Sequence, residues 1–138
     1  MGCHFHRIIK GFVAQGGDFV KNNGSGGECV FSGKKAGFKD DPAGLKVKLG
    51  ERGVVAMGNS GKNTNTSQFF FTLDNVSKLT GKHVGFGKIV GGAEVLALME
   101  QCAAAVKNGT IVGGERGAVV GGRAAPPLRV DEGQRHDG

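Results

Sequence analysis

The sequence predicts a single, mainly β domain over residues 1–138 with one α-helix near its C-terminal end. Glycine accounts for 27 of the 138 residues, and each glycine inside a helix costs about 1 kcal/mol, which argues against a helical bundle. Short apolar segments, rich in β-branched and aromatic residues, alternate with polar loops along most of the chain. Helical spacing of apolar residues is clear in one late segment. A barrel or a sandwich of short strands is therefore the expected architecture.

The first third of the chain is expected to form strands and two long loops. An apolar, β-rich stretch covers 5–13 and is interrupted by Gly11, and strand character resumes over 15–20. Polar, glycine-rich sequence over 22–27 and over 32–44 predicts loops.

The middle of the chain contains the strongest strand signal, which covers 67–73 and includes Phe69, Phe70 and Phe71. Side chains alternate along a strand, so these three phenylalanines cannot share one face. Both faces must be covered, or one face must line a pocket. The other expected segments of this region are a buried strand over 53–57, a polar loop over 59–66, a loop over 74–82 and an alternating strand over 83–90.

The helix is expected to begin near Gly92 and to end at Asn108-Gly109. Spacings of three and four residues predict an apolar stripe formed by Val95, Leu98, Met99, Cys102 and Val106. The segments that follow are a flexible insert over 109–125, a last strand at Leu128-Arg129-Val130 and a frayed polar tail over 134–138.

Composition excludes several classes of protein. The longest apolar runs are far shorter than the roughly 20 residues of a membrane helix, so no membrane partner is expected. The net charge of +6 is spread without a run of five basic residues, which disfavours nucleic acid as a partner. Cys3, Cys29 and Cys102 fit neither a disulfide framework nor a CxxC site. We expect a reducing, cytoplasmic location, with the nucleus and organelles left open.

The sequence gives little support for a cofactor site or a metal site. The stretch 56–63 departs at both ends from a phosphate-binding loop. His4 and His6 lack a third metal ligand nearby. No cofactor and no metal is expected.

Arg7 lies within an apolar strand, where a buried arginine is costly unless it is paired or functional. Gln15 follows eight residues later, and this even offset places both side chains on one face if the strand stays regular. From these residues alone, an ion-pair role for Arg7 is favoured over a functional one.

Three motifs resemble the signature sequences of the cyclophilins, the peptidyl-prolyl cis-trans isomerases. They are FHRIIKGFVAQGGDF at 5–19, MGNSGKNTNTSQFF at 57–70 and GKHVGFG at 81–87. The resemblance runs from about Phe5 to Met99. It implies an antiparallel β-barrel with a capping α-helix, an activity that rotates X-Pro peptide bonds, and proline-containing peptides or proteins as partners.

The resemblance also assigns roles to residues. Arg7 takes the position of the catalytic arginine, and Gln15 stands beside it as a second catalytic residue. The positions that would bind the proline-containing substrate are Phe12, Val13, Gly58, Asn59, Ser60, Gln68, Phe70, Leu79 and His83. Val13 stands where the family often has methionine, and Gly58 and Ser60 stand where alanines are common.

The chain departs from the family in two further places. Lys78 occupies a position that is often tryptophan and takes part in cyclosporin binding, so weak binding of cyclosporin is expected. The family has roughly fifty residues before the first motif, and these supply two strands and a helix that this chain lacks. Three explanations of this difference are open. The sequence is a fragment or has a wrong start codon, a partner chain completes the barrel, or the protein is a truncated subunit. The alternative function is a weakly active or inactive proline-binding module in a larger assembly.

Overall fold

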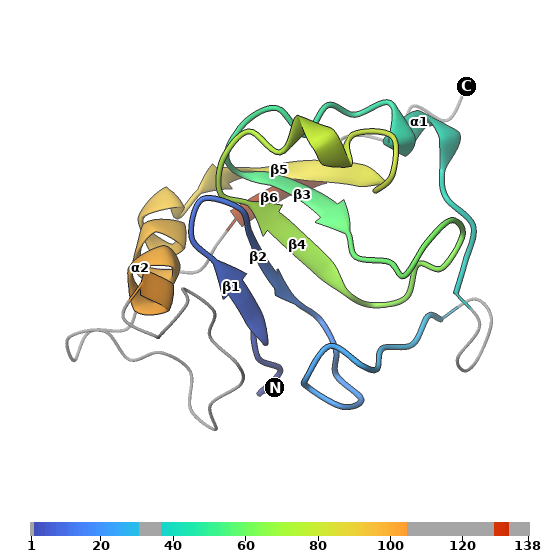
Figure 1. Cartoon of the computed structure of the whole chain (residues 1–138), viewed down its shortest axis with the longest axis horizontal. Helices are drawn as coiled ribbons and strands as arrows, with labels where there is room; N and C mark the ends of the chain where they lie inside the picture. The colour runs from blue at the N-terminus through green and yellow to red at the C-terminus, as the bar shows by residue number, and fades with distance from the viewer. Residues whose placement is uncertain (1, 31–36, 105–128, 133–138) are drawn as a thin grey trace.

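A computed structural model describes residues 2–30, 37–104 and 129–132. The strands form one antiparallel sheet in the order β1-β2-β4-β3-β5-β6 (Figure 1). The elements are β1 (Arg7–Ile9), β2 (Val13–Gly16), α1 (Pro42–Leu45), β3 (Val54–Met57), β4 (Phe69–Thr72), the 3₁₀ turn η1 (Ser77–Leu79), β5 (Gly85–Gly91), α2 (Ala93–Ala104) and β6 (Arg129–Glu132). This mainly β fold with one long helix confirms the predicted class.

The two faces of the sheet bury different residues, as the run of phenylalanines requires. Ile8, Ala14, Phe71 and Val55 are paired in register across four neighbouring strands and belong to one buried cluster. The next row of paired residues, one position along each strand, points to the opposite face. That face carries a second cluster, which includes Val13, Phe70, Ala56, Leu49 and Val76. Both faces are therefore covered, which is the first of the two alternatives that the sequence left open.

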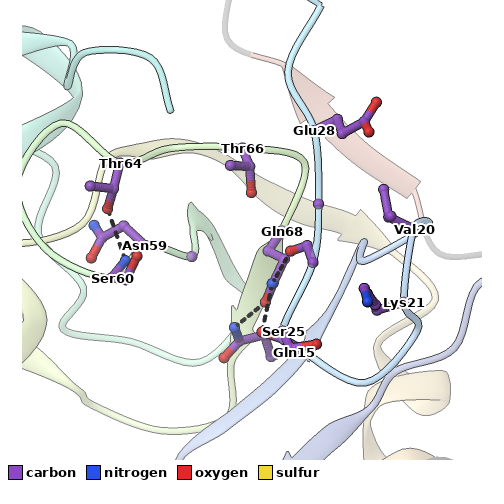
Figure 2. Close-up of a pocket in the computed structure, with 14 residues that line it drawn as sticks. Gln15, Val20, Lys21, Ser25, Glu28, Asn59, Ser60, Thr64, Thr66 and Gln68 are labelled. Atoms are coloured by element: carbon purple, nitrogen blue, oxygen red, sulfur yellow. Dashed lines mark hydrogen bonds between the residues drawn. The ribbon is translucent and has the colours of Figure 1, made fainter. Parts of the chain in front are cut away.

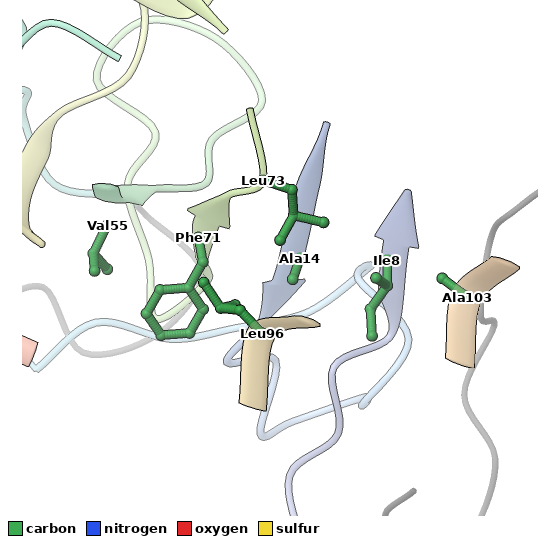
Figure 3. Packing of buried hydrophobic residues seen from close by; sticks show 7 residues of the cluster. All are labelled: Ile8, Ala14, Val55, Phe71, Leu73, Leu96 and Ala103. Carbon is green, nitrogen blue, oxygen red and sulfur yellow. The ribbon is translucent and has the colours of Figure 1, made fainter. Parts of the chain in front are cut away.

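Helix α2 covers the first face, next to β1 and β2 (Figures 1 and 3). Its fully buried side chains are Leu96 and Ala103, with Met99 packed against the same cluster. The position of the predicted apolar stripe was therefore wrong, because Val95, Leu98 and Cys102 are only half-buried. The buried stripe is rotated slightly around the helix axis from the predicted one. Residues three, four and seven apart share a face, and the sequence also contains that spacing in Leu96, Met99 and Ala103.

The β1–β2 connection is a tight hairpin. Gly11 has φ +70° in its three-residue turn, and the Phe12 N–H donates to the Ile9 carbonyl at 3.0 Å. The Gly11 N–H also donates to Glu100 Oε2 of α2 at 2.8 Å, and Arg52 pairs with the other oxygen of Glu100 at 2.9 Å. These contacts fix the hairpin, and Phe12 with it, against the helix.

Several expected boundaries were wrong. Strand β2 ends at Gly16, because Gly17 has φ +89° and turns the chain. The predicted loop over 32–44 contains the start of α1, where Asp41 caps a short helix with proline in its first turn. Strand β6 confirms a last strand near Leu128. Val106, the insert over 109–125 and the tail over 134–138 lie outside the described residues.

The sheet is open within the described part of the chain. Among the described residues, strands β1 and β6 are its two edges and do not pair with each other. The expected barrel, from which two strands are missing, is therefore corrected to an open sheet. Among the described residues, no helix combines the length and the apolar composition needed to span a bilayer.

The position of the α2 stripe can be tested by two matched truncations. Leu96→Ala is expected to lower the free energy of unfolding by about 2–5 kcal/mol, because it leaves a cavity in the core. Leu98→Ala, on a half-buried residue of the same helix, should cost clearly less. Urea unfolding of both variants measures the difference. Equal costs would contradict the assignment of Leu96 to the centre of the stripe.

Candidate functional site

Arg7 and Gln15 face each other directly across the β1–β2 hairpin. Residues opposite one another in antiparallel strands project to the same face. The prediction that they share a face therefore holds, but the assumption of one regular strand was wrong. The same row continues through Phe70 of β4 to Ala56 of β3. The sheet thus places the guanidinium, an amide and an aromatic ring in line on the face opposite α2.

Arg7 is exposed, although it lies in an apolar strand. The neighbouring Ile8 takes the core-facing position, so Arg7 projects from the other side of an edge strand. Within the described part of the chain, the one ion pair joins Arg52 and Glu100. The ion-pair role favoured by the residues alone is therefore wrong for Arg7, and its guanidinium has no carboxylate partner there.

An apolar cluster lies beside Gln15 on this face. Val13 and Phe70 are its buried floor, and Phe12 and Leu79 are partly buried at its margin. His83 packs edge-on against Phe70 with ring centroids 5.2 Å apart. The His83 Nδ1 lies 2.9 Å from the Met57 carbonyl oxygen, which can only accept, so this nitrogen carries the proton. We call Phe12, Val13, Phe70 and Leu79 the apolar cluster.

A polar pocket of about 570 Å³ adjoins the apolar cluster at Gln15 (Figure 2). Gln15, Gly58, Asn59, Ser60 and Gln68 form one side of it. The other side is the glycine loop, residues 18–27, which contributes Lys21, Ser25 and the backbone of its glycines. All predicted substrate-binding residues thus lie either in the apolar cluster, beside it as His83 does, or along this pocket.

A chain of side-chain amides joins the sheet to the glycine loop (Figure 2). Gln15 Nε2 donates to Gln68 Oε1 at 2.9 Å. Gln68 Nε2 in turn donates to the carbonyl oxygens of Gly24 and Gly26, at 2.9 and 2.6 Å. A Cβ at Gly58 would lie 3.1 Å from Gln15 Nε2, so a larger residue there would require the Gln15 amide to shift by a few tenths of an ångström. The amide chain fixes the orientation of both glutamines.

Asp18 organises the glycine loop from within. Its side chain is fully buried and accepts backbone N–H groups from Val20, Lys21, Asn23, Gly24 and Gly26 at 2.9–3.2 Å. Burial alone would raise the pKa of this carboxyl, but the backbone hydrogen bonds outweigh it and hold the pKa well below its ordinary value. The ionised carboxylate is therefore the form that holds the loop.

His6 supports the same loop from the core side. It is 7% exposed, its Nδ1 has no hydrogen-bond partner among the described residues, and a Cβ built at Gly24 would lie 2.7 Å from its Nε2. Gly24 also has φ +91°, so only glycine fits there. Burial lowers the pKa of His6 more than the nearby Asp18 carboxylate raises it, and Arg7 lowers it further. The ring is therefore neutral at pH 7.

Comparison with known proteins agrees with this geometry. A family model described as cyclophilin type peptidyl-prolyl cis-trans isomerase/CLD matches residues 1–113. The chain belongs to this family. It is also 46% identical over 99 residues to peptidyl-prolyl cis-trans isomerase cyp11 of Rhizopus delemar. That alignment covers 72% of this cyclophilin chain but only 28% of the relative, so the chain spans less than a third of the relative's length.

Sequence reasoning missed two parts of the site in this cyclophilin chain. The first is Asp18, although an aspartate followed by glycines is a residue type that binds nearby backbone N–H groups. The second is the part of the pocket formed by Lys21, Ser25 and Thr64, for which the sequence contains no local signal. Among the described residues, no group of three metal-binding side chains comes together.

The role of Asp18 predicts a large loss of stability on Asp18→Asn. The amide would turn an N–H donor toward some of the five backbone N–H groups, which leaves them unpaired in a buried site. We expect the free energy of unfolding to fall by about 2–4 kcal/mol, measured by urea unfolding. Asp74→Asn is the matched control, because that exposed carboxylate accepts one N–H from the adjacent Asn75. It should change stability by about 0.5 kcal/mol or less.

The lowered pKa of His6 predicts a pH-dependent stability. Below the ordinary histidine pKa of 6.5, the unfolded chain binds a proton that the folded chain resists, so stability falls as the pH falls. Urea unfolding between pH 7.5 and 5 should show this slope in the wild type and a shallower one in His6→Gln. Asp18 acts in a more acidic window, because its pKa lies below 3.8. Equal slopes in the two proteins would contradict the assignment.

Proposed function

We propose that this chain catalyses cis-trans isomerisation of X-Pro peptide bonds in peptides or proteins. The observation that carries the proposal is the exposed Arg7 guanidinium, without a carboxylate partner among the described residues, in one row with Gln15 and Phe70. Membership of the cyclophilin family supports it. Because the chain spans only part of its relative, the activity is a property to be measured on this chain.

The chemistry requires little more than a positioned hydrogen-bond donor. A peptide C–N bond resists rotation by about 18–20 kcal/mol, because the nitrogen lone pair is delocalised into the carbonyl. Rotation localises this lone pair on the proline nitrogen. A guanidinium N–H near that nitrogen gains a hydrogen bond in the twisted state that the planar states lack. Binding the twisted state more tightly than the planar states lowers the barrier.

Gln15 acts as a positioning residue for Arg7 in this proposal. Its Nε2 is engaged by Gln68, and its Oε1 has no donor among the described residues. The guanidinium directly opposite in the hairpin is a suitable donor for that oxygen. Gln15 would then hold Arg7 in place from a side chain that is itself held by the glycine loop.

The substrate would lie across the two parts of the site. The proline ring would pack on the apolar cluster, where Phe12 and Leu79 are partly exposed beside His83. The polar pocket would receive residues that flank the proline, and Asn59 and Ser60 are among the residues that line it. No step of this mechanism uses a metal or a cofactor.

A second candidate function is a non-catalytic proline-binding subunit, and the position of β1 favours it. Strand β1 carries Arg7 and pairs only with β2 among the described residues. A partner chain added at this edge would complete the sheet and cover the strand that holds the guanidinium. Weak cyclosporin binding, from Lys78, and a cytoplasmic location stay predictions under either function.

The isomerase proposal is tested by Arg7→Ala in a protease-coupled assay on a proline tetrapeptide. Losing a donor to the twisted state is expected to lower kcat/KM by about 100-fold or more. Lys88→Ala, which removes an exposed cation from β5, is the control and should keep wild-type activity. An Arg7→Ala variant with full activity would contradict the role of Arg7. A wild-type chain that binds the peptide without accelerating isomerisation would favour the second function.

A further inference from the structure

A lysine ammonium lies over an aromatic ring at the edge of the apolar cluster. Lys78, in η1, has its Nζ 4.7 Å from the centroid of the Phe12 ring. Phe12 belongs to the hairpin turn between β1 and β2, so two segments far apart in the sequence bring the charge and the ring together. The ammonium is thus located at the margin of the surface where the proline ring would pack.

The contact restricts where the ammonium can be. The negative face of an aromatic ring attracts a lysine ammonium, which favours this position over others that the side chain could take in solvent. Phe12 is itself fixed, because the adjacent Gly11 is hydrogen-bonded to Glu100 of α2. Leu79, next to Lys78, packs into the same cluster. Both partners are therefore held by the fold.

The charge of Lys78 is not neutralised within the described part of the chain. The single ion pair there uses Arg52 and Glu100, and no carboxylate lies within ion-pair distance of Lys78. Arg7, which projects from the face of the sheet that carries the apolar cluster, also has no ion pair among the described residues. The whole chain has a net charge of +6. A peptide bound on this face would therefore meet two uncompensated cations.

The register places Lys78 at one end of the candidate site. Along β2, Gln15 borders the polar pocket, Val13 lies in the apolar cluster, and Phe12 follows at the hairpin turn. Lys78 therefore lies at the end of the site away from the polar pocket. An extended peptide advances about 3.3 Å per residue, so the first few residues beyond the proline ring on that side pass Lys78.

We propose that Lys78 is a specificity-determining residue that favours substrates with an aspartate or glutamate close to the proline, on the flank that passes over Phe12. The proposal rests on the proposed isomerase function, whose substrate class it narrows. The carboxylate would pair with the Lys78 ammonium while the ring holds the aliphatic stem and its charge in place. Peptides with a neutral or basic residue at that position would lack this interaction.

The test compares pairs of peptides that differ only by glutamate or glutamine at one position flanking the proline. At low salt, the wild type should show a kcat/KM ratio of about two- to fivefold in favour of glutamate on one flank, the size expected of a partly exposed ion pair. The ratio should approach one in Lys78→Gln and at high salt. It should persist in Lys78→Arg, because a guanidinium also stacks on an aromatic ring.

Lys88→Gln is the matched control, because it removes the same charge from an exposed position on β5, and it should keep the wild-type ratio. A ratio of one in the wild type, or a ratio unchanged in Lys78→Gln, would overturn the proposal. If the chain accelerates no peptide, the isomerase proposal fails separately. Calorimetry on the same peptide pairs then gives their dissociation constants. The preference of Lys78 for glutamate is tested by the ratio of these constants within each pair.

Discussion

The alternation of side chains along β4 is the constraint on which the rest of the structure depends. Phe71 points to the face covered by α2, and Phe70 points to the face with the candidate site. Since β4 lies between β2 and β3, this alternation sets the orientation of both neighbours through their registers. A slip by one residue would exchange the two faces. The same two neighbouring aromatic residues, Phe70 and Phe71, therefore specify the core and the site.

The polar pocket depends on a different interaction, the burial of one carboxylate. A glycine-rich loop loses much conformational entropy when it becomes ordered. Asp18 offsets this cost by accepting five backbone N–H groups, and Gln68 adds hydrogen bonds to two carbonyl oxygens of the same loop. The loop is thereby attached to the sheet at Gln68 and through it to Gln15. The ordered conformation of the glycine loop therefore helps to fix Gln15, which lies beside Arg7 in the sheet.

The sequence predicted the features that depend on local residue patterns. It missed the features that depend on how the strands pair with one another. That Phe70 and Phe71 point to opposite faces followed from period-two alternation. The hairpin at Gly11 was not recognised, because a glycine within an apolar run predicts a break without showing where the chain goes next. Arg7 was expected to be buried and paired, because the sequence does not show which strands lie at the edges of the sheet. Its exposure follows from the edge position of β1, which is a property of the whole sheet. The helix stripe was shifted because Val95 and Leu98 fit the period nearly as well as Leu96.

The unpaired state of Arg7 is itself an argument about function. A surface arginine commonly gains some stability from a nearby carboxylate, yet the one ion pair in the described part of the chain joins Arg52 and Glu100 and does not include Arg7. In the proposed mechanism, a carboxylate on Arg7 would compete with the twisted proline nitrogen for the guanidinium donors, and would weaken the differential binding that lowers the barrier. The same holds at the other end of the site, where an aromatic ring rather than a carboxylate locates Lys78. A ring fixes the position of a cation without neutralising it, so both charges stay available to a bound peptide.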